Sequence, residues 1–433
     1  MAIIPYTAAT PEEFALAYND NVYVWRSTDT STTLRFKVNI MPSGTLTTLA
    51  TLIVYPIPEP FGTSQNRAFV EVSRIVQSQL SKDLAIPTAN NAAFFMCPNM
   101  HTEYRVVVQE QDISATTGAY TDLNQIYFYE DRSVWNGVQN TADWLDFDHT
   151  DYLMTVGVGT DKFLTEGPTT REINSAQSAF LYFIAGEDQA PARYRLQTYS
   201  GYNGTGSVLN NVTVANPFAA DMSASYQKKY LRIPVGTYDI PLIDSGSMTG
   251  GTPSTVLNNA KSYTIRLEDN VGVGQVISET FTFNVDQDCT KFTPVRLHWM
   301  NRLGGFDSFN FDLKSEERTD VNRRDFRQQP YTWDGANYAS VTWAYNKENR
   351  GRKTYDTQLT KKLRVNTNYL TEEESVWMED LFTSPEIYQE VNNELLAVNI
   401  DGQSISKKTS LNDKLMQYSF DLEYSLLNSR QRG

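Results

Sequence analysis

The chain has 433 residues, a length that predicts three domains at about 150 residues per domain. Its 37 Lys and Arg residues against 51 Asp and Glu residues give a net charge of −14. This charge argues against a general nucleic-acid-coating surface, because phosphate binding needs a basic one. Aromatic residues make up 12% of the chain and charged residues only 20%, a composition that favours β-sheets and buried interfaces.

The two cysteines, Cys97 and Cys289, are too few for a disulfide framework or a multi-cysteine zinc site. The first residues lack the basic and long apolar segments of a secretory signal, and no run of about 18 apolar residues occurs. We therefore expect a chain that is made in the cytoplasm, is not processed and has no membrane partner.

Short alternating strands dominate the first two thirds of the chain. Apolar and polar residues alternate over 34–40, 194–199, 263–268 and 281–285, and turn-forming Gly, Asn, Ser and Pro residues separate such runs. This pattern predicts an N-terminal β-sandwich-like domain over 1–156 and a central immunoglobulin-like or jelly-roll β-domain over 157–290. A short helix over 74–80, with Ser73 as its cap, is expected in the first of these domains.

The pattern changes after residue 290, and a C-terminal α+β module is expected over 291–433. Alternation before and after Gly304-Gly305 predicts a hairpin with a tight turn. Thr371 and Glu374 form a capping box for a helix that should end near Phe382, before Ser384-Pro385. The last alternating strand covers 416–424. The predicted fold is mainly β, with tandem β-sandwich-like domains followed by this small module.

Two segments of the C-terminal module resemble one family of proteins. Residues 297–311, LHWMNRLGGFDSFNF, resemble a motif in virion proteins of crAss-like and other Bacteroidetes-infecting tailed phages. Residues 370–388, LTEEESVWMEDLFTSPEIY, together with 407–413 and the final strand, resemble the C-terminal module of the same proteins. The resemblance covers 291–433, and residues 22–84 are more loosely similar to the N-terminal β-domain of that group.

The resemblance implies a tail or neck ring protein of a virion, assembled in the host bacterial cytoplasm as a cyclic homo-oligomer without chemistry of its own. Its partners would be further copies of itself and other tail or portal-proximal proteins of the virion. No catalytic residue is carried over.

The residues of the 297–311 motif predict a rigid hairpin, with a ligand-reading loop as the alternative. Gly305 is expected to adopt a positive φ. The expected turn formers of the motif are Asn301, Gly304 and Gly305, and its expected packing residues are Trp299, Phe309 and Phe311. Arg302 and Asp307 are expected to form an ion pair across the turn.

The sequence offers little for catalysis, and we predict no enzyme, no cofactor and no metal site. Asp146, Asp148 and Asp151 would offer oxygen ligands to Ca²⁺ if a loop brought them together, but the glycine and terminal glutamate of the helix-loop-helix motif are missing. A solvated acidic loop is the interpretation we prefer. No nucleophile motif surrounds Cys97 and His101, so a buried thiol is expected.

One basic segment stands out from the acidic chain. Residues 314–364 contain 12 Lys or Arg and 7 Asp or Glu, a balance of +5. This asymmetry favours a head-to-tail contact between subunits, and the candidate interface residues are Arg318, Arg323, Arg324 and Arg327. Residues 320–329 are expected to form an exposed arm that orders only on assembly. DNA contact would require these arginines to face the lumen of a channel.

Two other functions remain open at the level of sequence. A glycan- or receptor-binding tail protein would present Trp and Tyr in a concave groove. A phage-borne glycan hydrolase would add two close carboxylates to such a groove.

Overall fold

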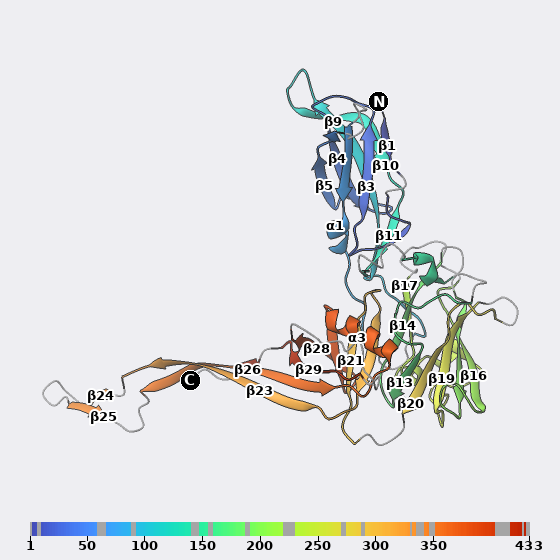
Figure 1. The fold of residues 1–433 in the computed structure, drawn as a ribbon, viewed down its shortest axis with the longest axis vertical. Helices are drawn as coiled ribbons and strands as arrows, with labels where there is room; N and C mark the ends of the chain where they lie inside the picture. The colour runs from blue at the N-terminus through green and yellow to red at the C-terminus, as the bar shows by residue number, and fades with distance from the viewer. Residues whose placement is uncertain are drawn as a thin grey trace. The chain divides into compact units, whose positions relative to one another are not determined.

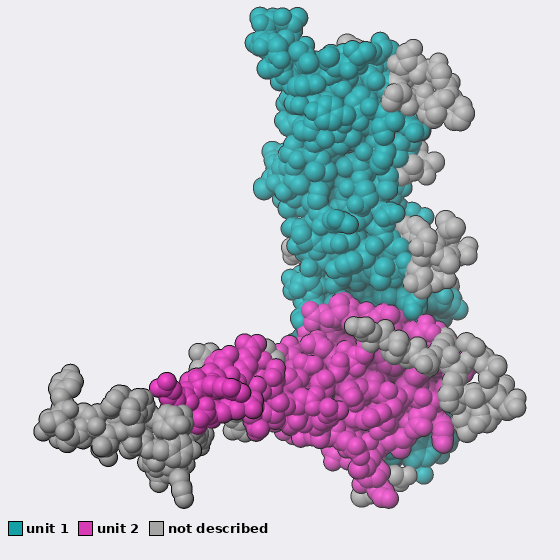
Figure 2. Space-filling model, turned by 60° about the vertical axis from the view of Figure 1, so that its left-hand side comes forward, with its two compact units in different colours: residues 1–287, 300–308 teal, residues 288–299, 309–433 magenta. Residues whose placement is uncertain are grey.

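The computed structural model describes most of the chain and confirms a mainly β fold, with β-sandwiches followed by a small α+β end (Figure 1). It divides into two compact units, residues 1–287 with 300–308 and residues 288–299 with 309–433 (Figure 2). The described residues are 2–6, 10–58, 66–87, 92–139, 147–154, 159–186, 191–219, 230–269, 274–286, 291–329, 331–334, 342–345, 351–402, 416–426 and 428–429.

The N-terminal part of unit 1 is a sandwich of two sheets. The rings of Trp25 and Phe36, one from each sheet, meet edge to face at 5.4 Å inside a buried apolar cluster. One sheet has the order β1 (Ile3–Pro5), β3 (Val22–Ser27), β7 (Asn66–Glu71) and β6 (Ile57–Pro58). The other has the order β2 (Phe14–Leu16), β11 (Arg132–Trp135), β9 (His101–Ile113), β4 (Arg35–Pro42) and β5 (Ala50–Val54), with β10 (Tyr120–Phe128) beside β9.

The predicted first helix is present but begins differently. Helix α1 (Ser73–Gln77) has Val72 at its N-cap position, without a side-chain capping hydrogen bond, and the expectation of a Ser73 cap is wrong. The Ser73 hydroxyl is used elsewhere: it accepts a hydrogen bond from the Asn21 N–H at 2.9 Å and donates one to the Asn19 carbonyl at 2.7 Å. A buried hydroxyl takes the partners that the fold offers, because leaving it unpaired would be costly.

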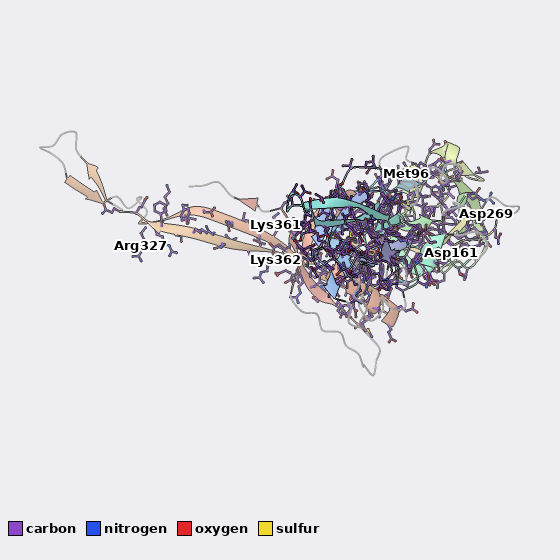
Figure 3. The ribbon with its side chains drawn as sticks, turned by 90° about the horizontal axis from the view of Figure 1, so that it is seen from above. Met96, Asp161, Asp269, Arg327, Lys361 and Lys362 are labelled. Atoms are coloured by element: carbon purple, nitrogen blue, oxygen red, sulfur yellow. The ribbon has the colours of Figure 1, made fainter. Side chains whose placement is uncertain are left out.

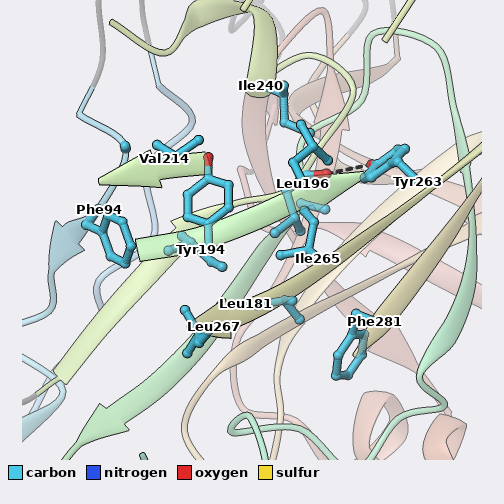
Figure 4. Close-up of a cluster of buried hydrophobic side chains, with 14 of the residues drawn as sticks. Phe94, Leu181, Tyr194, Leu196, Val214, Ile240, Tyr263, Ile265, Leu267 and Phe281 are labelled. Carbon is cyan, nitrogen blue, oxygen red and sulfur yellow. Dashed lines mark hydrogen bonds between the residues drawn. The ribbon is translucent and has the colours of Figure 1, made fainter. Parts of the chain in front are cut away.

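The second sandwich of unit 1 encloses a larger apolar cluster, in which the Tyr263 hydroxyl donates to the Val235 carbonyl at 2.6 Å (Figure 4). One sheet has the order β12 (Leu153–Met154), β14 (Phe180–Ala185), β17 (Tyr230–Pro234) and β8 (Phe95–Met96). The other has the order β13 (Thr170–Asn174), β20 (Phe281–Asp286), β19 (Ser262–Glu268), β15 (Arg193–Tyr199), β16 (Val208–Ala215) and β18 (Met248–Thr249). Short 3₁₀ helices are η2 (His149–Tyr152), η5 (Ile240–Leu242) and η6 (Ser245–Ser247).

Strands β8 and β12 show that the two sandwiches are interleaved in sequence. Both strands fall within the range predicted for the first domain, yet they join the sheet of β14 and β17. Phe94, just before β8, packs against Phe183 and Tyr194 of the second core. The three-domain division, with boundaries after residues 156 and 290, stays a prediction.

Unit 2 is an α+β layer structure. Helix α3 (Glu372–Thr383) has the predicted capping box between Thr371 and Glu374, and its buried Trp377 belongs to the core of this unit. The sheet has the order β22 (Phe306–Phe311), β21 (Val295–Met300), β27 (Ile387–Val391), β28 (Glu394–Asp401), β29 (Ser419–Tyr424), β26 (Arg352–Asn366) and β23 (Glu316–Arg327), with β30 (Asn428–Ser429) beside β26. A separate ribbon pairs β24 (Tyr331–Asp334) with β25 (Thr342–Tyr345).

The hairpin of β21 and β22 belongs to both units. Its tip, residues 300–308, is part of unit 1, whereas its two ends are part of unit 2. The helices of the described ranges all fall short of the length and apolar character needed to cross a membrane.

Candidate assembly interface

The predicted hairpin at residues 297–311 is present, and its turn is held by Asn301. The Asn301 N–H donates to the Gly305 carbonyl at 2.9 Å, and the Asn301 Oδ1 accepts from the Leu303 N–H at 3.0 Å. Both Asn301 and Leu303 are buried. The turn is therefore a packed part of unit 1 and has no exposed surface for reading a ligand at these residues.

Asp307 connects this tip to the second sandwich. Its Oδ1 accepts from the Arg171 Nη1 at 3.0 Å and its Oδ2 from the Asn301 Nδ2 at 2.9 Å, while the Thr165 hydroxyl lies 2.8 Å from both oxygens. The side chains of Arg171 and Asp307 are only 8% and 2% exposed. Arg302, in turn, approaches Glu166 at 3.5 Å. The expected pairing of Arg302 with Asp307 is corrected: each has a partner far away in sequence.

The two turn glycines have different roles from those expected. Gly304 has the positive φ, +85°, and a Cβ there would lie 2.0 Å from the Asn136 carbonyl oxygen. Gly305 has no positive φ, but a Cβ there would lie 2.6 Å from the Leu164 carbonyl oxygen. The expectation for Gly305 is thus wrong in its cause: close packing, and not backbone conformation, requires this glycine.

The aromatic residues of the motif pack in unit 2. Trp299 lies 5.1 Å from Trp377 of α3, and Phe309 lies 6.0 Å from the same ring. Phe311 meets Phe420 edge to face at 5.4 Å. The motif therefore has a polar tip, which is part of unit 1, and an aromatic base, which is part of unit 2. Its residues serve packing and turn formation.

A buried ionic cluster lies on β21 near these aromatics. The His298 Nε2 is 2.9 Å and the Arg296 Nε 3.3 Å from the same oxygen of Glu390. Arg296 also donates to the Asn310 side chain at 2.8 Å. Burial lowers the pKa of His298 below its usual value, and the hydrogen bond to Glu390 opposes this effect only in part. Every member of the cluster binds other residues of this chain, which indicates a structural role.

The other candidate chemical groups are also engaged. Asp148 accepts from the Thr150 N–H at 2.9 Å, and Asp151 pairs with Lys162 at 2.8 Å, while Asp146 lies outside the described residues. Cys97 is a buried thiol, as expected, and burial raises its pKa to about 12. His101 stacks on Tyr230 at 4.4 Å. Within the described ranges, no group of three or more His, Cys, Asp or Glu residues is arranged to hold a metal ion.

Strands β23 and β26, which we call the arm, contain all four candidate interface arginines. The strands pair antiparallel from Glu316 and Arg364 at the base to Arg327 and Arg352 near the far end, with an irregularity after Arg324. Figures 1 and 3 show the arm running away from the rest of the sheet, with Arg327 far out along it and Lys361 and Lys362 nearer its base. Residues 320–329 are exposed, as expected, except for the half-buried Asp320 and Asp325. Residues 320–327 are already paired with β26, which corrects the expectation that they order only on assembly.

The acidic residues of the arm are mostly neutralised by their neighbours. Asp320 pairs with Arg318 at 2.8 Å, and Asp325 pairs with Arg352 at 2.7 Å. A hydrogen bond from Thr354, followed by the charge of Arg352, holds the pKa of Asp325 below its usual value. Arg318 is therefore committed within its own strand and is a weaker candidate for an intersubunit contact than the other three arginines.

Several cations of the arm have no such partner. The side chains of Arg323, Arg324 and Arg327 make no hydrogen bond or ion pair with any described residue, and the same holds for the side chains of Lys353 and Lys361 on β26. The two lysines were missed at the level of sequence because the polar run 352–362 has no alternation that marks a strand. Their register partners, Phe326 and Thr319, identify them as part of the same ribbon.

Exposed aromatic residues accompany these cations. The rings of Phe326 and Tyr355 lie 6.1 Å apart, and the two residues are 41% and 45% exposed. Arginine and aromatic residues together are the composition that protein interfaces favour. The arm can therefore bind a protein surface of opposite charge.

No known family model matches this chain. No curated protein matches it either. Its own residues are thus the basis for a functional assignment.

Proposed function

We propose that this chain is a non-enzymatic structural subunit that assembles as a cyclic homo-oligomer through its arm. The observation that carries the proposal is the set of arm cations, most of them exposed, whose side chains pair with no described residue, in an otherwise acidic chain. A ring needs two different surfaces on each copy, one of which fits the other on the neighbour. A basic arm and an acidic body meet this requirement within a single chain.

The charge balance supports this reading. Strands β23 and β26 contain nine Lys or Arg and five Asp or Glu, so the arm has a net charge of +4. Since the whole chain is −14, the remainder is −18. Opposite charge on two surfaces speeds their encounter and sets their register, while buried apolar contacts supply most of the affinity.

The proposal includes a setting: a tail or neck ring of a phage virion, beside other tail or portal-proximal proteins. The resemblance of residues 291–433 to virion proteins of crAss-like phages supports this setting. For a glycan-binding tail protein or a glycan hydrolase, the exposed aromatic residues among the described ones include tyrosines such as Tyr55 and Tyr202. The four tryptophans whose side chains are described, Trp25, Trp135, Trp299 and Trp377, are buried and cannot stack on a sugar, which lowers the support for these two functions. DNA contact belongs to the proposal only where the arms line the lumen of the ring.

Native mass spectrometry of the purified full chain tests the proposal. We expect the wild type to form closed oligomers, and the double variant Arg323→Glu with Arg324→Glu to remain monomeric with an unchanged melting temperature. The control is Arg74→Glu with Lys261→Glu, which makes the same charge change at two exposed residues that are not part of the arm. Rings formed equally well by the arm variant would exclude the arm from the interface.

A further inference from the structure

The register of the arm separates its cations onto two faces. Side chains alternate across a strand, so Arg324 and Phe326 share one face of β23, while Val321, Arg323 and Arg327 share the other. Lys353 lies opposite Phe326, and Tyr355 contacts the Phe326 ring. We call Arg324, Phe326, Lys353 and Tyr355 the aromatic face, and Val321, Arg323 and Arg327 the opposite face.

The aromatic face lies where the sheet is only two strands wide. Strand β29 pairs with β26 from Lys362 to Asn366, and β30 pairs with Gln358 and Leu359. Beyond Gln358, toward Arg352, β23 is the only described strand that pairs with β26. A two-stranded ribbon is marginally stable in water, because it has no layer on which to bury its side chains. Covering the two exposed aromatic rings of such a ribbon with another surface removes apolar area from water and so stabilises the ribbon.

The cations on this face are free to bind that surface. Neither Arg324 nor Lys353 makes an ion pair with a described residue, and Asp356, the register partner of Arg324, forms none with it. The opposite face also carries cations that pair with no described residue, Arg323 and Arg327, and it differs because the two aromatic rings of the arm lie on the other face. The aromatic face also contains Asp356, so a larger positive charge does not set it apart. Its distinguishing feature is the two exposed rings, which lie beside the unpaired cations Arg324 and Lys353.

We propose that the aromatic face of the arm binds an acidic surface, outside the arm, on a second copy of this chain. This inference rests on the proposed function and adds to it the contacting face and the chemistry of its acceptor. Charge complementarity identifies the second copy as the occupant, because the chain outside the arm has a net charge of −18. Arg324 offers a planar fork to carboxylates, and Phe326 and Tyr355 supply the apolar anchor.

Photo-crosslinking in the assembling full chain tests which face is covered. We expect p-benzoylphenylalanine at position 326 to give a covalent dimer, whose crosslinked peptide is acidic and comes from outside the arm of the second copy. The matched control places the same residue at position 321, on the opposite face of the same strand, where we expect at least tenfold less dimer. Stronger crosslinking at 321, or a crosslinked peptide from the arm itself, would overturn the inference.

Charge reversal on each face gives an independent measurement. Arg324→Glu with Lys353→Glu should raise the concentration needed for half assembly at least tenfold, and Arg323→Glu with Arg327→Glu less than threefold. Both variants change the charge by the same amount on the same ribbon, so unspecific electrostatics cannot separate them. Equal effects, or the reverse order, refute the assignment to the aromatic face.

The two proposals fail in different ways. A wild type that assembles, with both face variants assembling as it does, contradicts this inference and leaves self-assembly intact. A wild type that remains monomeric at every accessible concentration contradicts the proposed self-assembly, and with it the second copy as the occupant.

Discussion

The β21–β22 tip and the arm are both antiparallel hairpins, yet they treat their charged residues in opposite ways. In the tip, Asp307 has accepted hydrogen bonds from Arg171, Asn301 and Thr165, and all four side chains are buried. In the arm, Arg323, Arg324 and Arg327 are exposed, and their side chains make no hydrogen bond or ion pair with a described residue. A hairpin whose polar groups are all paired internally stabilises its own chain, whereas one with unpaired cations is suited to a partner.

Burial decides how much an ion pair of the same type matters. The Arg171–Asp307 pair spans 3.0 Å between side chains that are 8% and 2% exposed, while the Arg352–Asp325 pair spans 2.7 Å with Arg352 76% exposed. An exposed pair is worth about 0–1 kcal/mol, because water competes for both charges. Removing one partner of a buried pair costs far more, because the other charge is left without compensation.

The largest expected effect comes from Asp307→Asn in the tip. Arg171 would remain buried without its carboxylate, and we expect the free energy of unfolding of unit 1 to fall by about 3–5 kcal/mol. The matched control in the arm, Asp325→Asn, should lower the free energy of unfolding by less than about 1 kcal/mol. Urea unfolding of both variants measures the difference, and equal losses would show that burial does not distinguish the two hairpins.

The next effect concerns one glycine in each region. Gly304→Ala places a Cβ 2.0 Å from the Asn136 carbonyl oxygen at a φ of +85°, and should cost about 2–4 kcal/mol in the stability of unit 1. Gly351, at the arm, has no atom within 4 Å of its added Cβ. Gly351→Ala should therefore change stability by less than about 0.5 kcal/mol. A tolerant Gly304 would mean that the tip can move away from Asn136.

The same contrast explains which strands could be predicted from the sequence. Residues 34–40 alternate because β4 has one buried and one half-buried face, and the capping box of α3 is local chemistry that needs no tertiary information. Strand β23 is exposed on both faces, so apolar and polar residues do not alternate along it. The sequence of 320–329 therefore gives no sign of a strand. The charge of this segment identified it as an interface candidate, but its strand conformation could be recognised only once its pairing with β26 was known.

The partners of the tip could not be predicted for a different reason. Asp307 binds Arg171, 136 positions earlier in the chain, and nothing in the local sequence separates this partner from Arg302 nearby. The unpaired state of Lys353 and Lys361 is equally a property of the register, since their neighbours across the ribbon are Phe326 and Thr319. Local spacing identifies a hairpin, whereas the folded chain decides what its side chains bind.

A smaller, pH-dependent effect should come from His298 on β21, at the buried base of the tip. Its pKa is lowered in the folded state, mainly by burial, so the unfolded chain binds a proton more readily. Its contribution to stability is complete above its unfolded pKa of about 6.5 and is lost as the pH falls below it, at no more than about 1.4 kcal/mol per pH unit. We expect His298→Gln to flatten the fall in melting temperature between pH 7 and pH 5. An unchanged pH profile would show that His298 does not titrate on unfolding in this range.

The smallest expected effect on folding is that of Arg318, which separates folding from assembly within the arm. Its ion pair with Asp320 spans 2.8 Å at a side chain that is 72% exposed, so Arg318→Gln should cost at most about 0.5 kcal/mol of monomer stability, and less at high salt. Because Arg318 is already paired within β23 and Arg324 is not, Arg324→Gln should weaken assembly several-fold more than Arg318→Gln. Both substitutions remove one positive charge from the same face of the same strand, so their net electrostatic change is equal. Light scattering across a dilution series, with a urea melt of each preparation, measures the two effects together. A larger loss of assembly for Arg318→Gln would place the contact at the base of the arm, where β26 also pairs with β29.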